Sequence, residues 1–187
     1  MSIAVRSDGN GTVPTVSNLN LGARQTAPNL VTVAVGEGGK VRLRNANGSV
    51  DLIADIAGYY SAGSSGQFVP VAPTRFLDTR TGAGAAPIPT TAAGYVDLKA
   101  AGSRGVPSGA TAVVLNVTAT GVTAATDVRA YPAVSAAVPT VSNLTLAPGT
   151  TRANLAIVKA GNDGRVRIRN ADGRLHLIGD IAGYMFG

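Results

Sequence analysis

Short runs in which apolar and polar residues alternate follow one another along most of this chain of 187 residues. Runs of period two, bounded by Gly, Pro, Asn and Asp, are typical of strands that bury one face. They predict strands at residues 75–79, 95–99, 111–119, 127–131, 142–146, 154–159, 165–169 and 175–184. Pro and Gly interrupt the Ala-rich stretches at 83–93 and 133–138 before either forms an amphipathic helix. The pattern therefore predicts an all-β fold, an antiparallel β-sandwich or jelly-roll-like module with no substantial helix.

The chain contains an internal repeat. Residues 13–60 align without a gap with residues 138–185, an offset of 125 (138 minus 13), and 27 of the 48 aligned positions are identical. Residues 66–125 have no counterpart upstream. Because the period is as long as a domain, the repeat indicates tandem modules, each with its own core, rather than a solenoid.

This repeat predicts three parts. Residues 1–60 are the second half of one module, residues 61–67 are a linker rich in Gly and Ser, and residues 68–187 are a complete module. Half a sandwich exposes sheet edges and an apolar face. Either the two pieces share one core or the missing half comes from elsewhere. One alternative is a homo-oligomer or fibre in which another copy supplies the missing strands.

Several motifs of the complete module resemble a known family. They are Pro73-Thr74-Arg75-Phe76-Leu77-Asp78-Thr79-Arg80-Thr81-Gly82, Gly105-Val106-Pro107, Ala112-Val113-Val114-Leu115-Asn116-Val117-Thr118, Ser142-Asn143-Leu144 and Asp180-Ile181-Ala182-Gly183-Tyr184. These motifs resemble the repeated module of secreted, multidomain actinobacterial proteins. The resemblance covers residues 68–185, and 13–60 as a second half. It implies an extracellular or cell-wall location and a non-catalytic role beside exported enzymes or on surface proteins.

Charge and composition narrow the classes of molecule that the chain is expected to bind. The net charge is +6 and the pI about 10.2, which favours polyanions such as acidic or teichoic cell-wall polymers. Nucleic acid is disfavoured because aromatics make up only 4% of the residues and no nucleic-acid motif is present. The absence of Cys excludes disulfides and thiolate metal sites. No apolar run reaches the length of a membrane span, and the N-terminus lacks the apolar core of a signal peptide, so an exported parent is expected to contribute this chain as an internal or processed piece.

Two cationic strands are the candidate polyanion site. Alternation places Lys40, Arg42 and Arg44 on one face of the first strand, and it does the same for three arginines of the second, Arg165, Arg167 and Arg169. Cations about 7 Å apart suit the phosphates or carboxylates of a wall polymer. The alternative is a solvated outer face, or a charged edge that prevents aggregation.

Four tyrosines are the candidates for stacking on a sugar ring in a chain without Trp. They are Tyr59, Tyr60, Tyr131 and Tyr184. The alternative for Tyr59 and Tyr184 is that they cover the end of the core with their hydroxyls toward solvent.

Charged residues also stand among apolar ones. Arg75, Asp78 and Arg80 form one cluster, and Asp55 and Asp180 lie within apolar strands. Because an unpaired buried carboxylate is costly, we expect a structural ion-pair network in which Asp180 meets Arg75 or Arg80. A calcium or other ligand site is the alternative.

Repeated asparagines are expected to cap sheet edges or turns, with sugar contacts as the alternative. They are Asn18 and Asn143, and Asn29 and Asn154.

Catalytic motifs are missing from the sequence. His176 is the single histidine, and no triad, multi-histidine metal site or phosphate-binding loop can be assembled, so we expect no enzyme activity, cofactor or metal. The sequence thus predicts a non-catalytic extracellular structural or adhesive module that spaces or anchors partner domains at the cell surface. A carbohydrate- or polyanion-binding module and a self-assembling fibre subunit are the alternatives.

Overall fold

The computed structural model describes residues 1–7, 17–135 and 137–187. Contacts divide the chain into two units, Met1–Ala54 and Asp55–Gly187. Strands are the main regular structure of the described residues in both units, and the only helical element there is the short 3-10 turn η1, Glu37–Gly39, so the predicted all-β fold is confirmed. Within the described ranges, no helix is long and apolar enough to span a membrane.

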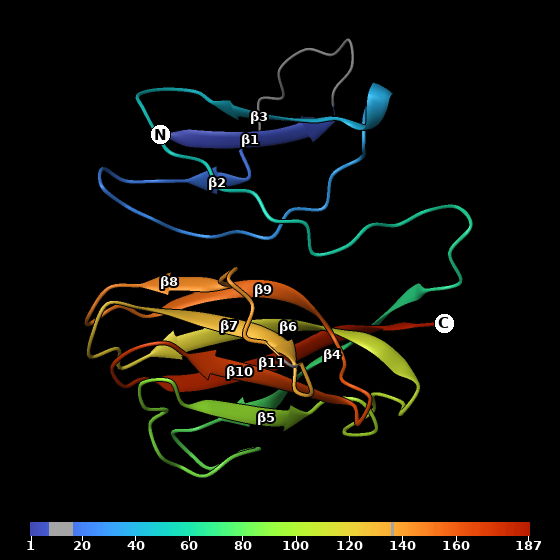
Figure 1. Ribbon diagram of the computed structural model, residues 1–187, viewed down its shortest axis with the longest axis vertical. Helices are drawn as coiled ribbons and strands as arrows, with labels where there is room; N and C mark the ends of the chain where they lie inside the picture. Colours follow the sequence, from blue (N-terminus) through green and yellow to red (C-terminus); the bar gives the residue numbers. More distant parts are fainter. Residues whose placement is uncertain (8–16, 136) are drawn as a thin grey trace. The chain divides into compact units, whose positions relative to one another are not determined.

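The unit Asp55–Gly187 contains a strand at each of the eight predicted places. Their bounds are β4 Gln67–Asp78, β5 Tyr95–Lys99, β6 Ala110–Thr120, β7 Thr126–Pro132, β8 Leu144–Leu146, β9 Arg152–Lys159, β10 Arg165–Asn170 and β11 His176–Phe186. They pair antiparallel in two four-stranded sheets of order β5-β10-β7-β8 and β4-β11-β6-β9, and Figure 1 shows the strands of both sheets running across this unit. Counted from the first strand of the unit, the orders are 2-7-4-5 and 1-8-3-6, the arrangement of a jelly roll.

The core of this unit lies between the two sheets. Val113, Leu115 and Val117 alternate along β6 and are fully buried, as are Val166 and Ile168 on β10 of the other sheet. All five belong to one cluster of buried apolar side chains. A strand presents every second side chain to the same face, so the period-two pattern of the sequence becomes the inner surface of each sheet.

Strand β11 is central in its sheet, and both of its ladders are irregular at the same point. It pairs with β4 on one side and β6 on the other, and the register of both ladders shifts between Ile181 and Gly183. A Cβ atom at Gly183 would lie 2.3 Å from the ring of Phe68 and 2.8 Å from the carbonyl oxygen of Val69. The close approach of β4 therefore requires glycine at the irregularity.

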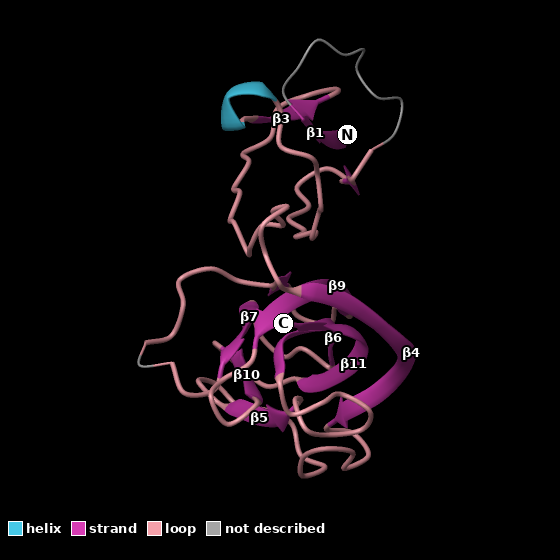
Figure 2. Cartoon of the chain, turned by 90° about the vertical axis from the view of Figure 1, so that its right-hand side faces the viewer, coloured by secondary structure: helices cyan, strands magenta, loops and turns pink. Residues whose placement is uncertain are grey.

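The unit Met1–Ala54 contains one small antiparallel sheet of order β2-β1-β3. Its strands are β1 Ser2–Ser7, β2 Leu19–Asn20 and β3 Val41–Asn45. Figure 2 shows most of the remaining chain in this unit as loop. The strand pattern of the sequence did not predict β1, and residues 13–16, where the sequence repeat begins, lie outside the described ranges.

Candidate functional site

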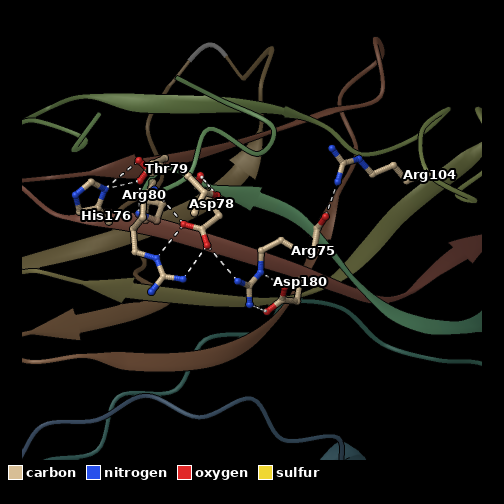
Figure 3. Close-up of polar contacts among 9 residues, drawn as sticks. Arg75, Asp78, Thr79, Arg80, Arg104, His176 and Asp180 are labelled. Atoms are coloured by element: carbon tan, nitrogen blue, oxygen red, sulfur yellow. Dashed lines mark hydrogen bonds and ion pairs between the residues drawn. The ribbon is translucent and has the colours of Figure 1, made fainter. Parts of the chain in front are cut away.

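Asp78, the last residue of β4, is the centre of the polar cluster (Figure 3). Its side chain is 3% exposed. Arg80 donates to it from the backbone N at 3.0 Å, from Nε at 2.9 Å and from Nη2 at 2.7 Å, and Arg75 Nη1 donates at 3.1 Å. The hydrogen bonds from the Arg80 side chain lower the pKa of Asp78 far below its usual value, against the opposing effect of burial. Asp78 is therefore held as a carboxylate.

Arg75 joins this cluster to the neighbouring strand. Its Nε donates to Asp180 Oδ1 at 2.7 Å and its Nη2 donates to Asp180 Oδ2 at 3.2 Å, linking β4 to β11. The hydrogen bond to Asp180 raises the pKa of Arg75. The structure thus brings together four of the five residues expected in a network, and Asp180 meets Arg75 as anticipated. Asp55 stands outside the network and has no ion-pair partner within the described ranges.

This cluster of Arg75, Asp78, Arg80 and Asp180 is a structural ion-pair network that holds β4 and β11 together. Two guanidinium groups face two carboxylates, so the charges balance and leave no excess to attract an anion or a cation. Nowhere in the described part of the chain do three or more His, Cys, Asp or Glu residues gather in a way that would hold a metal ion.

His176 also helps to hold β4 and β11 together. Its Nδ1 lies 3.1 Å from both Thr79 Oγ1 and Thr79 O, and the backbone N of Leu177 donates to Thr79 Oγ1 at 3.0 Å. These contacts fasten the turn after β4 to the beginning of β11 (Figure 3).

The cationic row of β10 follows the predicted alternation. Arg165, Arg167 and Arg169 share one face of the strand, while Val166 and Ile168 point into the core and are fully buried. The row faces outward because the core takes the apolar residues of the same strand.

Arg167 in this row is occupied by neighbours. Its Nε and Nη2 each donate to a different oxygen of Asp97 at 2.7 Å, and its guanidinium carbon lies 3.7 Å from the centroid of the Tyr95 ring. The hydrogen bonds to Asp97 raise the pKa of Arg167. A bidentate pair stacked on an aromatic ring holds the side chain in place, so Arg167 stabilises the sheet rather than extending toward a polymer.

The matching row of β3 lies in a different setting. Lys40, Arg42 and Arg44 are exposed, but Val41 and Leu43 on the opposite face are also 42% and 41% exposed. On β3, the alternation therefore separates the two kinds of side chain without burying the apolar kind.

The four candidate tyrosines divide into three groups. Tyr131 is only 4% exposed, so the expectation that its ring stacks on a sugar is wrong; the side chain is buried within the unit. Tyr184 is partly buried, packs against the core and meets Phe186 edge to face at 6.5 Å between centroids. Tyr59 and Tyr60 are 85% and 58% exposed.

The repeated asparagines make the same bonds in both units. Asn143 Oδ1 accepts from the backbone N of Ala130 at 2.6 Å, and Asn154 Nδ2 donates to the carbonyl of Asn143 at 2.9 Å. Asn18 accepts from the matching amide of β1 at 2.7 Å, and Asn29 donates to the carbonyl of Asn18 at 2.6 Å. The predicted side-chain caps are present, and they fasten a loop to the edge of each sheet.

A further repeated asparagine, Asn45 in the first unit and Asn170 in the second, lacks one hydrogen bond in the first unit. Asn45 Oδ1 is buried and, within the described residues, accepts no hydrogen bond. Its counterpart Asn170 Oδ1 accepts from Thr126 Oγ1 at 2.8 Å. Met1 stands at the position of Thr126 in the repeat and has no hydroxyl to donate.

A stretch of exposed apolar residues follows at 52–60. Ile53 is 90% exposed, Ile56 92% and Tyr59 85%. Scattered apolar residues on a surface are ordinary, whereas a run of large ones indicates a surface that binds another protein. This stretch is the strongest candidate for an interaction site in the described chain.

Comparison with models of known protein families and with curated proteins finds no match for this chain.

Proposed function

We propose that the chain is a non-catalytic structural or adhesive module that acts outside the cell, where it spaces or anchors partner domains at the cell surface. The observation that carries this proposal is the repetition of one structural unit in tandem. Strands β1, β2 and β3 pair in the same register as β7, β8 and β10, residue for residue at the offset of the sequence repeat. Tandem modules joined by short linkers increase the distance between their ends, which suits a spacer. The extracellular location rests on the resemblance of the motifs to the actinobacterial module.

The use made of the polar groups supports a non-catalytic role. Asp78 is saturated by hydrogen bonds from two arginines, and His176 is bonded to Thr79. A general acid or base must be able to exchange a proton with a substrate, and both groups are instead committed to holding β4 and β11 together.

A polyanion-binding module is the second candidate, and the outward-facing row on β10 favours it. Arg165 and Arg169 lie on either side of Arg167, and the whole chain carries a net charge of +6. Arg167 is paired with Asp97, and Arg165 Nη1 lies 3.7 Å from Asp163 Oδ2, so two of the three cations already face a carboxylate, which weakens this candidate relative to the first.

Sedimentation with purified actinobacterial cell wall tests both. The wild-type chain is compared with the double variant Arg165→Gln, Arg169→Gln at low and at high salt. An adhesive module co-sediments at both salt concentrations and the variant behaves like the wild type. Binding that high salt abolishes and that the variant loses favours the polyanion site. A chain that stays in the supernatant throughout is a spacer without adhesion. Soluble wall fragments released by the chain would refute the non-catalytic role.

A further inference from the structure

We propose that residues 1–60 form an acceptor for the front half of a module of the same kind, a polypeptide segment with the strand pattern of residues 61–125. The name front half is used below for residues 61–125, and the name back half for residues 126–185 and for their counterpart, residues 1–60. This inference concerns what residues 1–60 bind, and it does not depend on the location or adhesion proposed above.

The first unit is built as a back half as far as its own strands allow. Ile3 pairs with Leu19 as Val128 pairs with Leu144. The same correspondence holds on the other side of β1, where Ile3 faces Asn45. The sheet of the first unit is therefore already in the register of the complete module.

The correspondence ends where the front half is needed. Strand β11 is hydrogen-bonded to β4 and β6, and β9 is hydrogen-bonded to β6, and both partners belong to the front half. The counterparts of β11 and β9 in the first copy of the repeat, residues 51–61 and 27–34, form no strand.

Burial changes with the loss of these partners. Leu177 and Ile181 are fully buried in β11, while their counterparts Leu52 and Ile56 are 44% and 92% exposed. The apolar face is present in the sequence of residues 1–60, but the surface that would cover it is not within the same half.

The contacts of the complete module indicate which strands and side chains a segment must have to bind residues 1–60. It must supply a strand like β4 and a strand like β6, which surround the counterpart of β11. It must also bring an arginine where Arg75 stands, because Asp180 is paired with Arg75 and its counterpart Asp55 has no ion-pair partner in the described part of the chain. It must finally supply backbone carbonyl groups like those of Thr90 and Thr91, to which Asn170 Nδ2 donates at 3.3 and 3.1 Å.

Counting halves argues against strand exchange between copies of this chain as the final state. Each copy carries one front half and two back halves. A front half that is transferred to residues 1–60 of a neighbour leaves the back half at 126–185 of its own chain uncovered. Association of copies therefore covers one back half only by uncovering another. The segment that binds residues 1–60 must be an additional front half.

The test adds a second copy of residues 61–125 directly before Met1 of the full chain. This addition and residues 1–60 together make one period of the repeat, and residue 125 keeps its natural neighbour position before the counterpart of residue 126. Amide hydrogen exchange of residues 51–60 is measured by mass spectrometry in the extended and the unextended chain. We expect exchange in the extended chain to slow by at least about 100-fold as these residues become a central strand.

Matched variants of the added copy test the mode of binding. Leu115→Asp places a charge at a position that is fully buried in β6, and we expect it to abolish the protection of residues 51–60. Thr111→Asp makes the same charge change at an exposed position of the same strand and is expected to leave the protection intact.

A variant of the acceptor supplies an independent readout. A Cβ atom at Gly58 meets nothing within 4 Å, whereas at Gly183, its counterpart, it would collide with Phe68 and Val69 of β4. Gly58→Ala is therefore expected to be silent in the unextended chain and to reduce the protection in the extended chain by about tenfold or more.

A separate polypeptide of residues 61–125, titrated onto the unextended chain, distinguishes the sources of the front half. Protection by the separate polypeptide supports a donor on another chain, and protection only after fusion supports a donor that precedes residues 1–60 in the same chain. Unchanged exchange in both experiments would overturn the proposal. Protection that rises with the concentration of the unextended chain alone would also overturn it, because a second copy would then be the occupant.

Discussion

The two copies of one isoleucine allow a controlled measurement of what the second sheet contributes. Ile181 and Ile56 occupy the same place in the repeated sequence Asp-Ile-Ala-Gly-Tyr. Ile181 is fully buried in the core, where it pairs in register with Leu115 of β6, and Ile56 is 92% exposed. Replacement of each by alanine therefore makes the same chemical change in two different environments.

The expected magnitudes follow from burial. Ile181→Ala removes three buried carbon atoms, about 2.4 kcal/mol at ~0.8 kcal/mol for each, and the cavity raises the loss of unfolding free energy to about 3–4 kcal/mol. Ile56→Ala removes the same atoms from contact with water and is expected to change the unfolding free energy by less than about 0.5 kcal/mol.

Urea titration with hydrogen exchange read at β6 measures the midpoint of the jelly-roll unit alone. With a urea dependence of about 2 kcal/mol per molar, Ile181→Ala lowers this midpoint by about 1.5–2 M, and Ile56→Ala leaves it in place. An equal shift for both variants would refute the reasoning, because it would mean that residues 50–60 are packed as tightly as β11.

Three further predictions concern the polar contacts of the jelly-roll unit. Because the folded state lowers the pKa of Asp78, this carboxylate stabilises the unit above about pH 5, and this stabilisation is lost as the pH falls below the unfolded-state pKa of about 3.9 and through the lower folded-state pKa. Asp78→Asn is therefore expected to flatten the acidic part of a stability profile measured by thermal melts from about pH 2 to 7. An unchanged profile would contradict this prediction. Asn143→Ala leaves the amide of Ala130 without its acceptor and is expected to cost about 1–3 kcal/mol in urea unfolding, whereas no loss would mean that water replaces the side chain. Arg167→Lys keeps the charge but loses the bidentate geometry with Asp97; we expect a melting temperature lower by a few degrees, and a variant as stable as the wild type would show that charge alone suffices.

Periodicity was sufficient to predict the strands of the complete module. The eight predicted segments each overlap one of the strands β4 to β11, although β4 begins eight residues earlier than predicted, because an antiparallel sheet with one buried face imposes alternation on the sequence. The strand β1 escaped prediction, since Ser2–Ser7 shows no identity to its counterpart in β7. Only the matching register with β2 and β3 reveals that the two strands are equivalent.

The candidate site was predictable in its residue types and less so in its pairs. The cost of an unpaired carboxylate in an apolar strand led to the expectation that Asp180 meets Arg75, which lies 105 residues away. The pairing of Arg167 with Asp97 across 70 residues was not foreseen, because the sequence does not say that β5 and β10 are neighbours. The scarcity of large aromatics placed Tyr131 among the candidate rings for sugar stacking, whereas the structure buries it.

By itself, the sequence determined the strands of the complete module, the repeat and which residues of each of these strands share a face. These properties are local, since they follow from the geometry of an extended chain and from the order of apolar and polar residues. Burial was decided by the tertiary structure. The pentapeptide Asp-Ile-Ala-Gly-Tyr is the same at 55–59 and 180–184, yet Ile181 lies in the core and Ile56 in water. The reason is that β11 is held between β4 and β6, and a strand is buried only when the chain brings other strands to cover it.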